Sequence, residues 1–111
     1  MQQNSKRKYQ DTKTILSELV CIETVSGTST NDIIQLISKY CNELSDAKIV
    51  APGPTENQKN IAFRFGPDVA GGIILSGHTD VVPVTDQKWS HPPFAATERD
   101  GRIYGRGTCD M

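Results

Sequence analysis

A histidine and an aspartate stand two positions apart in the second half of the chain, at His78 and Asp80, in the stretch SGHTDVVPV. On an extended strand, residues i and i+2 point to the same side. A neutral imidazole is a good ligand for zinc. A ligating histidine usually gives its other ring N–H to a carboxylate, which fixes its tautomer. The spacing therefore makes His78 a candidate metal ligand, and Asp80 the carboxylate that orients it or a bound water.

Two other interpretations of this stretch have to be weighed. A single H-x-D pattern is common by chance, so on spacing alone a polar cap on an ordinary strand end remains the simpler interpretation. A serine hydrolase built on Ser76, His78 and Asp80 is weaker still. Alternate residues on a strand stand about 6.5–7 Å apart, which is too far for the hydrogen bond between nucleophile and base.

A third candidate, Asp110, follows the glycine-interrupted stretch IYGRG. Glycines allow close backbone approach at a site, and a carboxylate can bridge paired metal ions that polarise a carbonyl and activate water. An exposed carboxylate without a function is the alternative. The neighbouring Cys109 should point away from Asp110 on an extended segment, and we expect it to be a small buried residue. We expect His91 to be a loop histidine.

The candidate residues must be positioned by helices and strands, and two helices are predicted. Apolar residues recur at helical spacing over residues 11–22 and again over 30–45. Between them, residues 24–30 combine β-branched residues, serines and a glycine, which interrupt regular structure. Ser29 or Thr30 can accept a hydrogen bond from a free N–H at the start of the second helix.

The rest of the chain predicts strands and a hairpin, and hence the α/β fold class. Residues 47–51 and 60–66 read as strands, the second with alternating apolar positions. Residues 73–80 begin as a continuously apolar strand, as expected inside a sheet covered on both faces. Residues 94–107 predict a hairpin with Asp100 and Gly101 at its turn.

Composition narrows the function classes. The chain has 111 residues, which is at most one small domain, and a net charge of −1 from 12 basic and 13 acidic side chains. This balance argues against a charge-driven nucleic-acid or membrane-surface role. No apolar run is long enough for a membrane span, and the polar N-terminal stretch has no secretory h-region. Three widely spaced cysteines suggest no disulfide framework, so we expect a cytoplasmic protein.

Taken together, the motifs resemble a known family more specifically than any one residue does. LSGHTDVVPV, the following W and PPF, and TERDGRIYGRGTCDM resemble the dinuclear-zinc amidohydrolase and carboxypeptidase family. The leading LSELVCIETVSG is similar to that family's N-terminal helix and following turn. Within the family, GHTDVVPV and GRGTCDM are most similar to the acetylornithine deacetylase branch. The succinyl-diaminopimelate desuccinylase branch more often has alanines before the final DM.

The resemblance implies a fold and roles for the candidate residues. Residues 1–111 would be the N-terminal portion of a metallohydrolase catalytic domain, an α/β/α sandwich with a mixed sheet. His78 would be a terminal ligand of one zinc ion, and Asp80 would hold its imidazole as the candidate catalytic residue. Asp110 would bridge two zinc ions, for which Co²⁺ is a possible substitute.

The resemblance also implies an activity. The expected reaction is hydrolysis of a linear amide, N-acetyl-L-ornithine, to ornithine and acetate in arginine biosynthesis. Another acyl-amino-acid hydrolase, such as the desuccinylase, and a truncated non-catalytic remnant remain as alternatives. The family also uses a Glu-Glu pair, a further carboxylate ligand, a late histidine ligand and a lid domain that carries homodimerisation. None of these can be assigned to residues 1–111, so we expect this chain to be inactive alone.

Overall fold

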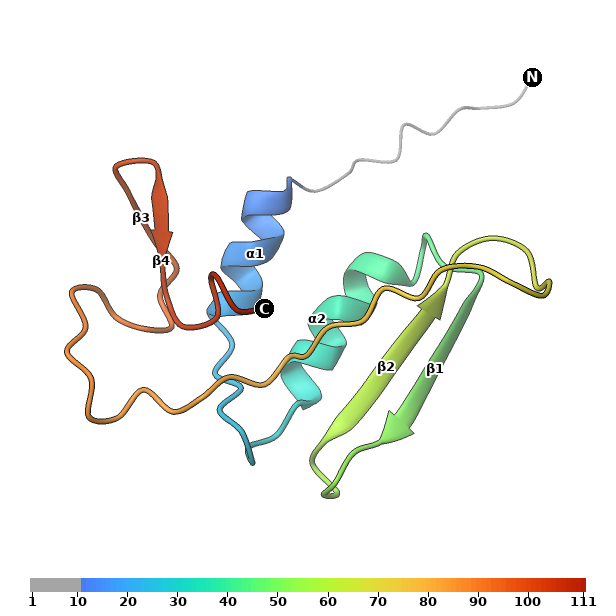
Figure 1. The fold of residues 1–111 in the computed structure, drawn as a ribbon, viewed down its shortest axis with the longest axis horizontal. Coiled ribbons are helices and arrows are strands. Elements are labelled where there is room, and N and C mark those ends of the chain that lie inside the picture. The colour runs from blue at the N-terminus through green and yellow to red at the C-terminus, as the bar shows by residue number, and fades with distance from the viewer. Residues whose placement is uncertain (1–10) are drawn as a thin grey trace.

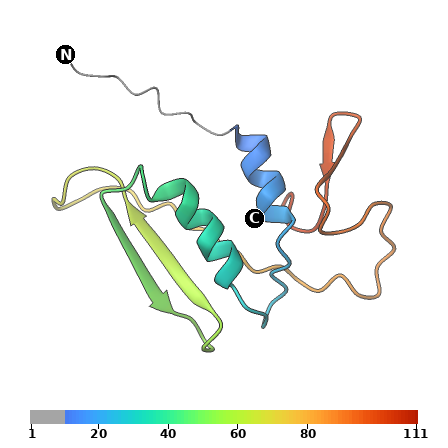
Figure 2. The same cartoon turned by 180° about the vertical axis from the view of Figure 1, so that it is seen from behind.

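Two helices, two hairpins and a long extended segment make up the structure, a computed structural model that describes residues 11–111 (Figure 1). Most of the polar N-terminal stretch therefore lies outside the described residues. The helix α2 lies beside the hairpin β1–β2, and the hairpin β3–β4 lies on the other side of α1 (Figures 1 and 2). None of the helices in this part of the chain is long and apolar enough to cross a membrane.

Both predicted helices are present, each somewhat shorter than the pattern suggested. The first, α1, spans Thr12–Val20, and the second, α2, spans Asn31–Cys41. After Cys41 the predicted helix continues only as a hydrogen-bonded turn, in which the N–H groups of Leu44 and Ser45 donate to the Cys41 carbonyl.

The start of α2 is held differently from the expected cap. The hydroxyl of Ser29 accepts a hydrogen bond from the Asn31 N–H at 3.2 Å. Thr30 occupies the N-cap position but makes no side-chain cap bond. Instead, its buried hydroxyl accepts the Lys59 N–H at 2.8 Å. Thr30 therefore ties the start of α2 to the start of the strand that packs beside it.

The first hairpin confirms two of the predicted strands. Strand β1 (Ala47–Pro52) pairs antiparallel with β2 (Lys59–Arg64), with Val50 opposite Ile61. The connection is closed by a hydrogen bond of 2.8 Å from the Gly53 N–H to the Gln58 carbonyl.

The second hairpin also forms where it was predicted. Strands β3 (Thr97–Arg99) and β4 (Arg102–Tyr104) are antiparallel. Asp100 and Gly101 have φ angles of 52° and 73°, as the two central residues of a type I′ turn require. The α/β class is thus confirmed. Both sheets are antiparallel, and the parallel pairing among the described residues is the single bridge between Val25 and Val81.

The predicted strand over residues 73–80 is wrong as a hydrogen-bonded strand. The segment contains no assigned strand, and Ile73, Ile74 and Leu75 are 91%, 92% and 93% exposed. An apolar run of this kind needs neighbours on both faces, and no segment within residues 11–111 supplies them. The described apolar core is correspondingly small: its buried members are Val20, Ile33 and Ile34.

Because residues 73–75 are apolar and exposed, we predict that the chain associates with itself. A contiguous apolar, extended backbone without neighbours is a template for pairing with another chain. We expect the molar mass from sedimentation equilibrium to rise with concentration, and Ile74→Lys to suppress that rise. Glu56→Lys, a charge change in the β1–β2 connection, serves as the control and should leave the association unchanged. A wild-type chain that stays monomeric at all concentrations contradicts the prediction.

A second prediction concerns the contact between the two helices. The hydroxyl of Tyr40 in α2 donates a hydrogen bond to the Glu18 carboxylate in α1. This hydrogen bond, with smaller contributions from burial and the Glu18 charge, raises the pKa of Tyr40. In the unfolded chain tyrosine titrates near about pH 10. The stabilisation is therefore present below that pH and is lost as the pH rises through the folded-state pKa.

The measurement is the melting temperature between neutral and strongly alkaline pH. The melting temperature of the wild type should fall further over this pH range than that of Tyr40→Phe, which lacks the titrating hydroxyl. Equal losses in the two proteins would show that this contact does not contribute.

Candidate metal centre

The stretch that carries His78 and Asp80 is held by the segment that follows α1. Residues Val25 and Val81 form the parallel bridge. The N–H of Val81 donates to the Thr24 carbonyl, and the N–H of Ser26 donates to the Val81 carbonyl, both at 2.9 Å. These bonds fix the backbone where the exposed apolar segment ends and the candidate residues begin.

The other side of the site comes from the turn after β4. The Arg106 N–H donates to the Pro93 carbonyl at 2.7 Å, and the Thr108 hydroxyl donates to the Gly105 carbonyl at 3.0 Å. Gly107 has a φ of 85°, in the left-handed region that favours glycine. The turn directs the following residues back toward the end of α1, which brings Asp110 to His78.

All three sequence-predicted candidates meet in space. The imidazole of His78 lies between two carboxylates: its Nδ1 is 3.3 Å from Asp80 Oδ1, and its Nε2 is 3.4 Å from Asp110 Oδ1. The shortest contact is with backbone, because Nδ1 is 2.8 Å from the Asp80 carbonyl oxygen. A carbonyl can only accept, so this hydrogen bond requires a proton on Nδ1. In the neutral ring, the lone pair of Nε2 then faces Asp110.

The charges of the site favour an imidazolium between carboxylates when no metal ion is bound. The hydrogen bond to the Asp80 backbone, followed by the contact with the Asp110 side chain, raises the pKa of His78. The hydrogen bond from the Ser26 hydroxyl chiefly lowers the pKa of Asp80, burial opposes this, and the charge of His78 lowers the pKa by a smaller amount. The cluster thus holds two negative groups ready for a cation.

The three candidates line one cavity of about 350 Å³, together with Ser26 and the turn at residues 105–109. Residues 11–111 contain no group of three or more histidine, cysteine, aspartate or glutamate side chains arranged to hold a metal ion. Within the described part of the chain, the candidate centre therefore consists of one imidazole and one facing carboxylate, with a second carboxylate beside the ring.

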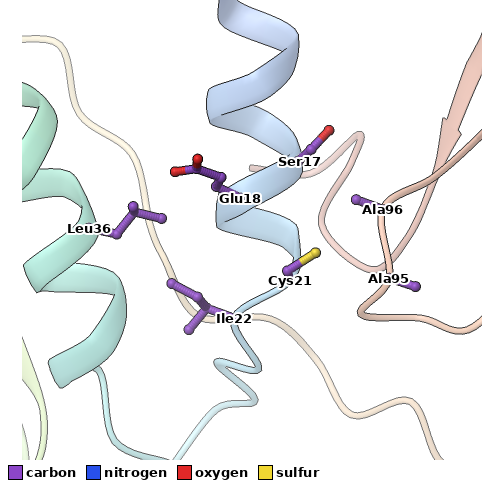
Figure 3. A pocket seen from close by; sticks show the side chains of 7 residues that line it. All are labelled: Ser17, Glu18, Cys21, Ile22, Leu36, Ala95 and Ala96. Carbon is purple, nitrogen blue, oxygen red and sulfur yellow. The ribbon is translucent and has the colours of Figure 1, made fainter. Parts of the chain in front are cut away.

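A second cavity, of about 430 Å³, lies around the end of α1, between Leu36 of α2 and residues 95–96, and does not include the three candidates. In Figure 3, Leu36 of α2 points toward α1, and Glu18 of α1 points toward α2. Its lining is largely apolar, and Glu18 is already engaged by Tyr40. This cavity therefore offers no second chemical site.

The sequence interpretation missed Ser26 and misjudged one neighbour. Ser26 donates a hydrogen bond of 2.7 Å to Asp80 Oδ2, and the signal that could have indicated it was the alternation of hydroxyl residues at positions 24 and 26. Cys109 is exposed, so its predicted burial is wrong; it follows a turn at the surface. His91 stacks on the Tyr104 ring, with centroids 4.4 Å apart, and is separate from the three candidates.

Comparison with known proteins supports a family assignment for the segment that carries the three candidate residues. Residues 74–111, which include all three candidates, match the profile of Peptidase family M20/M25/M40. The predicted family resemblance is confirmed. The chain is also similar to the acetylornithine deacetylase of Shigella sonnei (strain Ss046), with 38% identity over 104 residues. The match covers 87% of this chain and 27% of that relative, so the chain spans about a quarter of the length of the curated relative.

Proposed function

We propose that this chain carries part of the two-zinc centre of an amidohydrolase of the acetylornithine deacetylase type. His78 is the terminal ligand, Asp110 the bridging ligand and Asp80 the residue that orients His78. The observation that carries the proposal is the separation of 3.4 Å between His78 Nε2 and Asp110 Oδ1. Two ligands of one tetrahedral zinc ion, each about 2.0–2.2 Å from the metal, lie about 3.4 Å apart. The donor types and their spacing therefore fit zinc.

The roles of the chain's own residues follow from their contacts. With Nδ1–H donated to the Asp80 carbonyl, the His78 ring offers Nε2 as the ligand atom. The Asp110 carboxylate has two oxygens and is 92% exposed, so it could serve as the ligand shared by two ions. Bound zinc would supply Lewis acidity, which lowers the pKa of water and polarises the acyl carbonyl. The reaction is N-acetyl-L-ornithine plus water giving L-ornithine and acetate.

The remaining ligands and the proton acceptor are assigned to polypeptide other than residues 11–111, since that part holds no set of three metal-binding side chains. A catalytic zinc normally has three protein ligands. On the family resemblance, we also propose that residues 1–111 form the N-terminal portion of a catalytic domain and that the complete enzyme works as a homodimer. The cytoplasm and arginine biosynthesis are the proposed setting. The three cysteines are free, as a reducing compartment requires.

The test uses two proteins. The 111-residue chain should bind zinc weakly at His78 and show no turnover of N-acetyl-L-ornithine. The product of the full open reading frame that contains this chain, loaded with zinc, should hydrolyse N-acetyl-L-ornithine faster than N-succinyl-diaminopimelate. A faster rate on the succinyl substrate would assign a desuccinylase instead. A product with neither activity would overturn the proposed function.

A further inference from the structure

Two hydroxyl side chains from the segment after α1 reach the backbone and carboxylate of the candidate centre. The hydroxyl of Thr24 donates a hydrogen bond of 2.6 Å to the Thr79 carbonyl. The hydroxyl of Ser26 donates one of 2.7 Å to Asp80 Oδ2. Val25, which lies between them, is bridged to Val81, and Ser26 begins the turn that the Thr28 N–H closes on the Val25 carbonyl. The two hydroxyls thus reach consecutive residues of the site, Thr79 and Asp80.

Thr24 and Ser26 differ in burial, and they therefore contribute to the site in different ways. Thr24 is only 3% exposed, so water has little access to its side chain, and its hydroxyl bonds the Thr79 carbonyl instead. It fixes the peptide unit that joins Thr79 to Asp80, and thereby the direction of the Asp80 backbone, whose own carbonyl accepts the His78 Nδ1–H. Ser26, by contrast, is exposed. Its hydroxyl touches the site and no part of the apolar core.

The Ser26 contact also determines how the Asp80 carboxylate is oriented. With Oδ2 engaged by the Ser26 hydroxyl, Oδ1 is the oxygen that lies 3.3 Å from His78 Nδ1. Oδ1 of Asp80 is therefore held near Nδ1 through the Ser26 hydroxyl, whereas the Asp80 carbonyl belongs to the next peptide unit, whose Val81 N–H donates to the Thr24 carbonyl. The Thr24 hydroxyl holds the peptide unit before it. Free rotation of the carboxylate would remove the second acceptor from the ring.

We infer that Thr24 and Ser26 are positioning residues that lock His78 in the tautomer with its proton on Nδ1, which leaves Nε2 directed at Asp110. The inference rests on the proposed function only in taking zinc as the ion that Nε2 binds. Orienting partners of metal-binding histidines generally contribute about 10–100-fold to metal affinity. Ser26 acts through Asp80, so we expect the lower end of that range, about tenfold.

The first test measures the tautomer without any metal ion. In the 111-residue chain, at a pH where the ring is neutral, the NMR shifts of the two His78 ring nitrogens should show the proton on Nδ1. Ser26→Ala and Thr24→Val, which keep size and lose the hydroxyl, should shift the population toward protonation on Nε2. Ser26→Thr retains the hydroxyl and should restore the wild-type shifts. Ser29→Ala is the matched control from the same loop.

The second test is a titration of the same proteins with zinc chloride, followed by the His78 ring resonances. Ser26→Ala should weaken binding about tenfold, whereas Ser26→Thr and Ser29→Ala should bind as wild type does. Unchanged tautomer and unchanged zinc affinity in Ser26→Ala overturn the inference while the proposed zinc ligands stand. If wild type does not bind zinc at His78, the proposed function fails and the metal-free tautomer still decides the inference. If Thr24→Val does not fold, Ser26→Ala decides it, since Ser26 is outside the core.

Discussion

Replacing His78 by alanine is expected to abolish saturable zinc binding by the chain. The imidazole is the one histidine ligand of the candidate centre, and without it the exposed carboxylates of Asp80 and Asp110 and the Cys109 thiol are the metal-binding groups left around the cavity. Loss of an orienting partner alone costs about 10–100-fold in metal affinity, so loss of the ligand should exceed about 100-fold. The measurement is competition between the protein and a chromogenic zinc chelator, with folding checked by circular dichroism.

The chain supplies its own matched control for this experiment, because it contains two histidines. His91 is hydrogen-bonded to Ser90 at 3.0 Å and stacked on Tyr104, away from the candidate ligands. His91→Ala should therefore leave zinc binding at the wild-type level. Retention of binding in His78→Ala, or its loss in His91→Ala, would place the metal ion elsewhere.

Local patterns predicted most of the regular structure, because their causes are local. The helical spacing around Ile33 and Ile34 and the turn residues Asp100 and Gly101 act within a few residues, and the helix and hairpin appear where they were expected. The apolar run at Ile73–Leu75 differs in kind. Its sequence indicates a need for neighbours on both faces, which residues 11–111 do not provide. The apolar pattern indicates that the segment is suited to burial, but burial depends on neighbouring segments that the pattern does not encode.

The candidate site was predictable in its members but not in its contacts. The i, i+2 spacing indicated that His78 and Asp80 share a side, and both lie at one cavity. The spacing did not indicate that the nearest acceptor of the ring proton is the Asp80 carbonyl, because that depends on the local turn of the backbone. Ser26 and Asp80 are 54 positions apart in the sequence, so their contact could be identified only from the folded structure.

Gly105→Ala is expected to cost about 1–3 kcal/mol of unfolding free energy and to weaken zinc binding at the same time. A Cβ at this position would lie 2.6 Å from Val20 Cγ1 and 3.2 Å from the Pro93 carbonyl oxygen. Val20 is buried and β-branched, so its side chain has few rotamers by which to move away. Since Gly105 begins the turn that brings Asp110 to His78, a shift there should also separate the two proposed ligands.

Urea denaturation and zinc titration together test this link between the end of α1 and the site. Gly77→Ala is the control for stability, because its added Cβ would meet only the flexible end of the Met111 side chain. In Val20→Ala/Gly105→Ala the clashing Cγ1 is absent. The double variant should therefore be less destabilised than the two single changes added together. Strict additivity would mean that the close approach of Gly105 to Val20 does not limit the turn, and that another contact places Asp110.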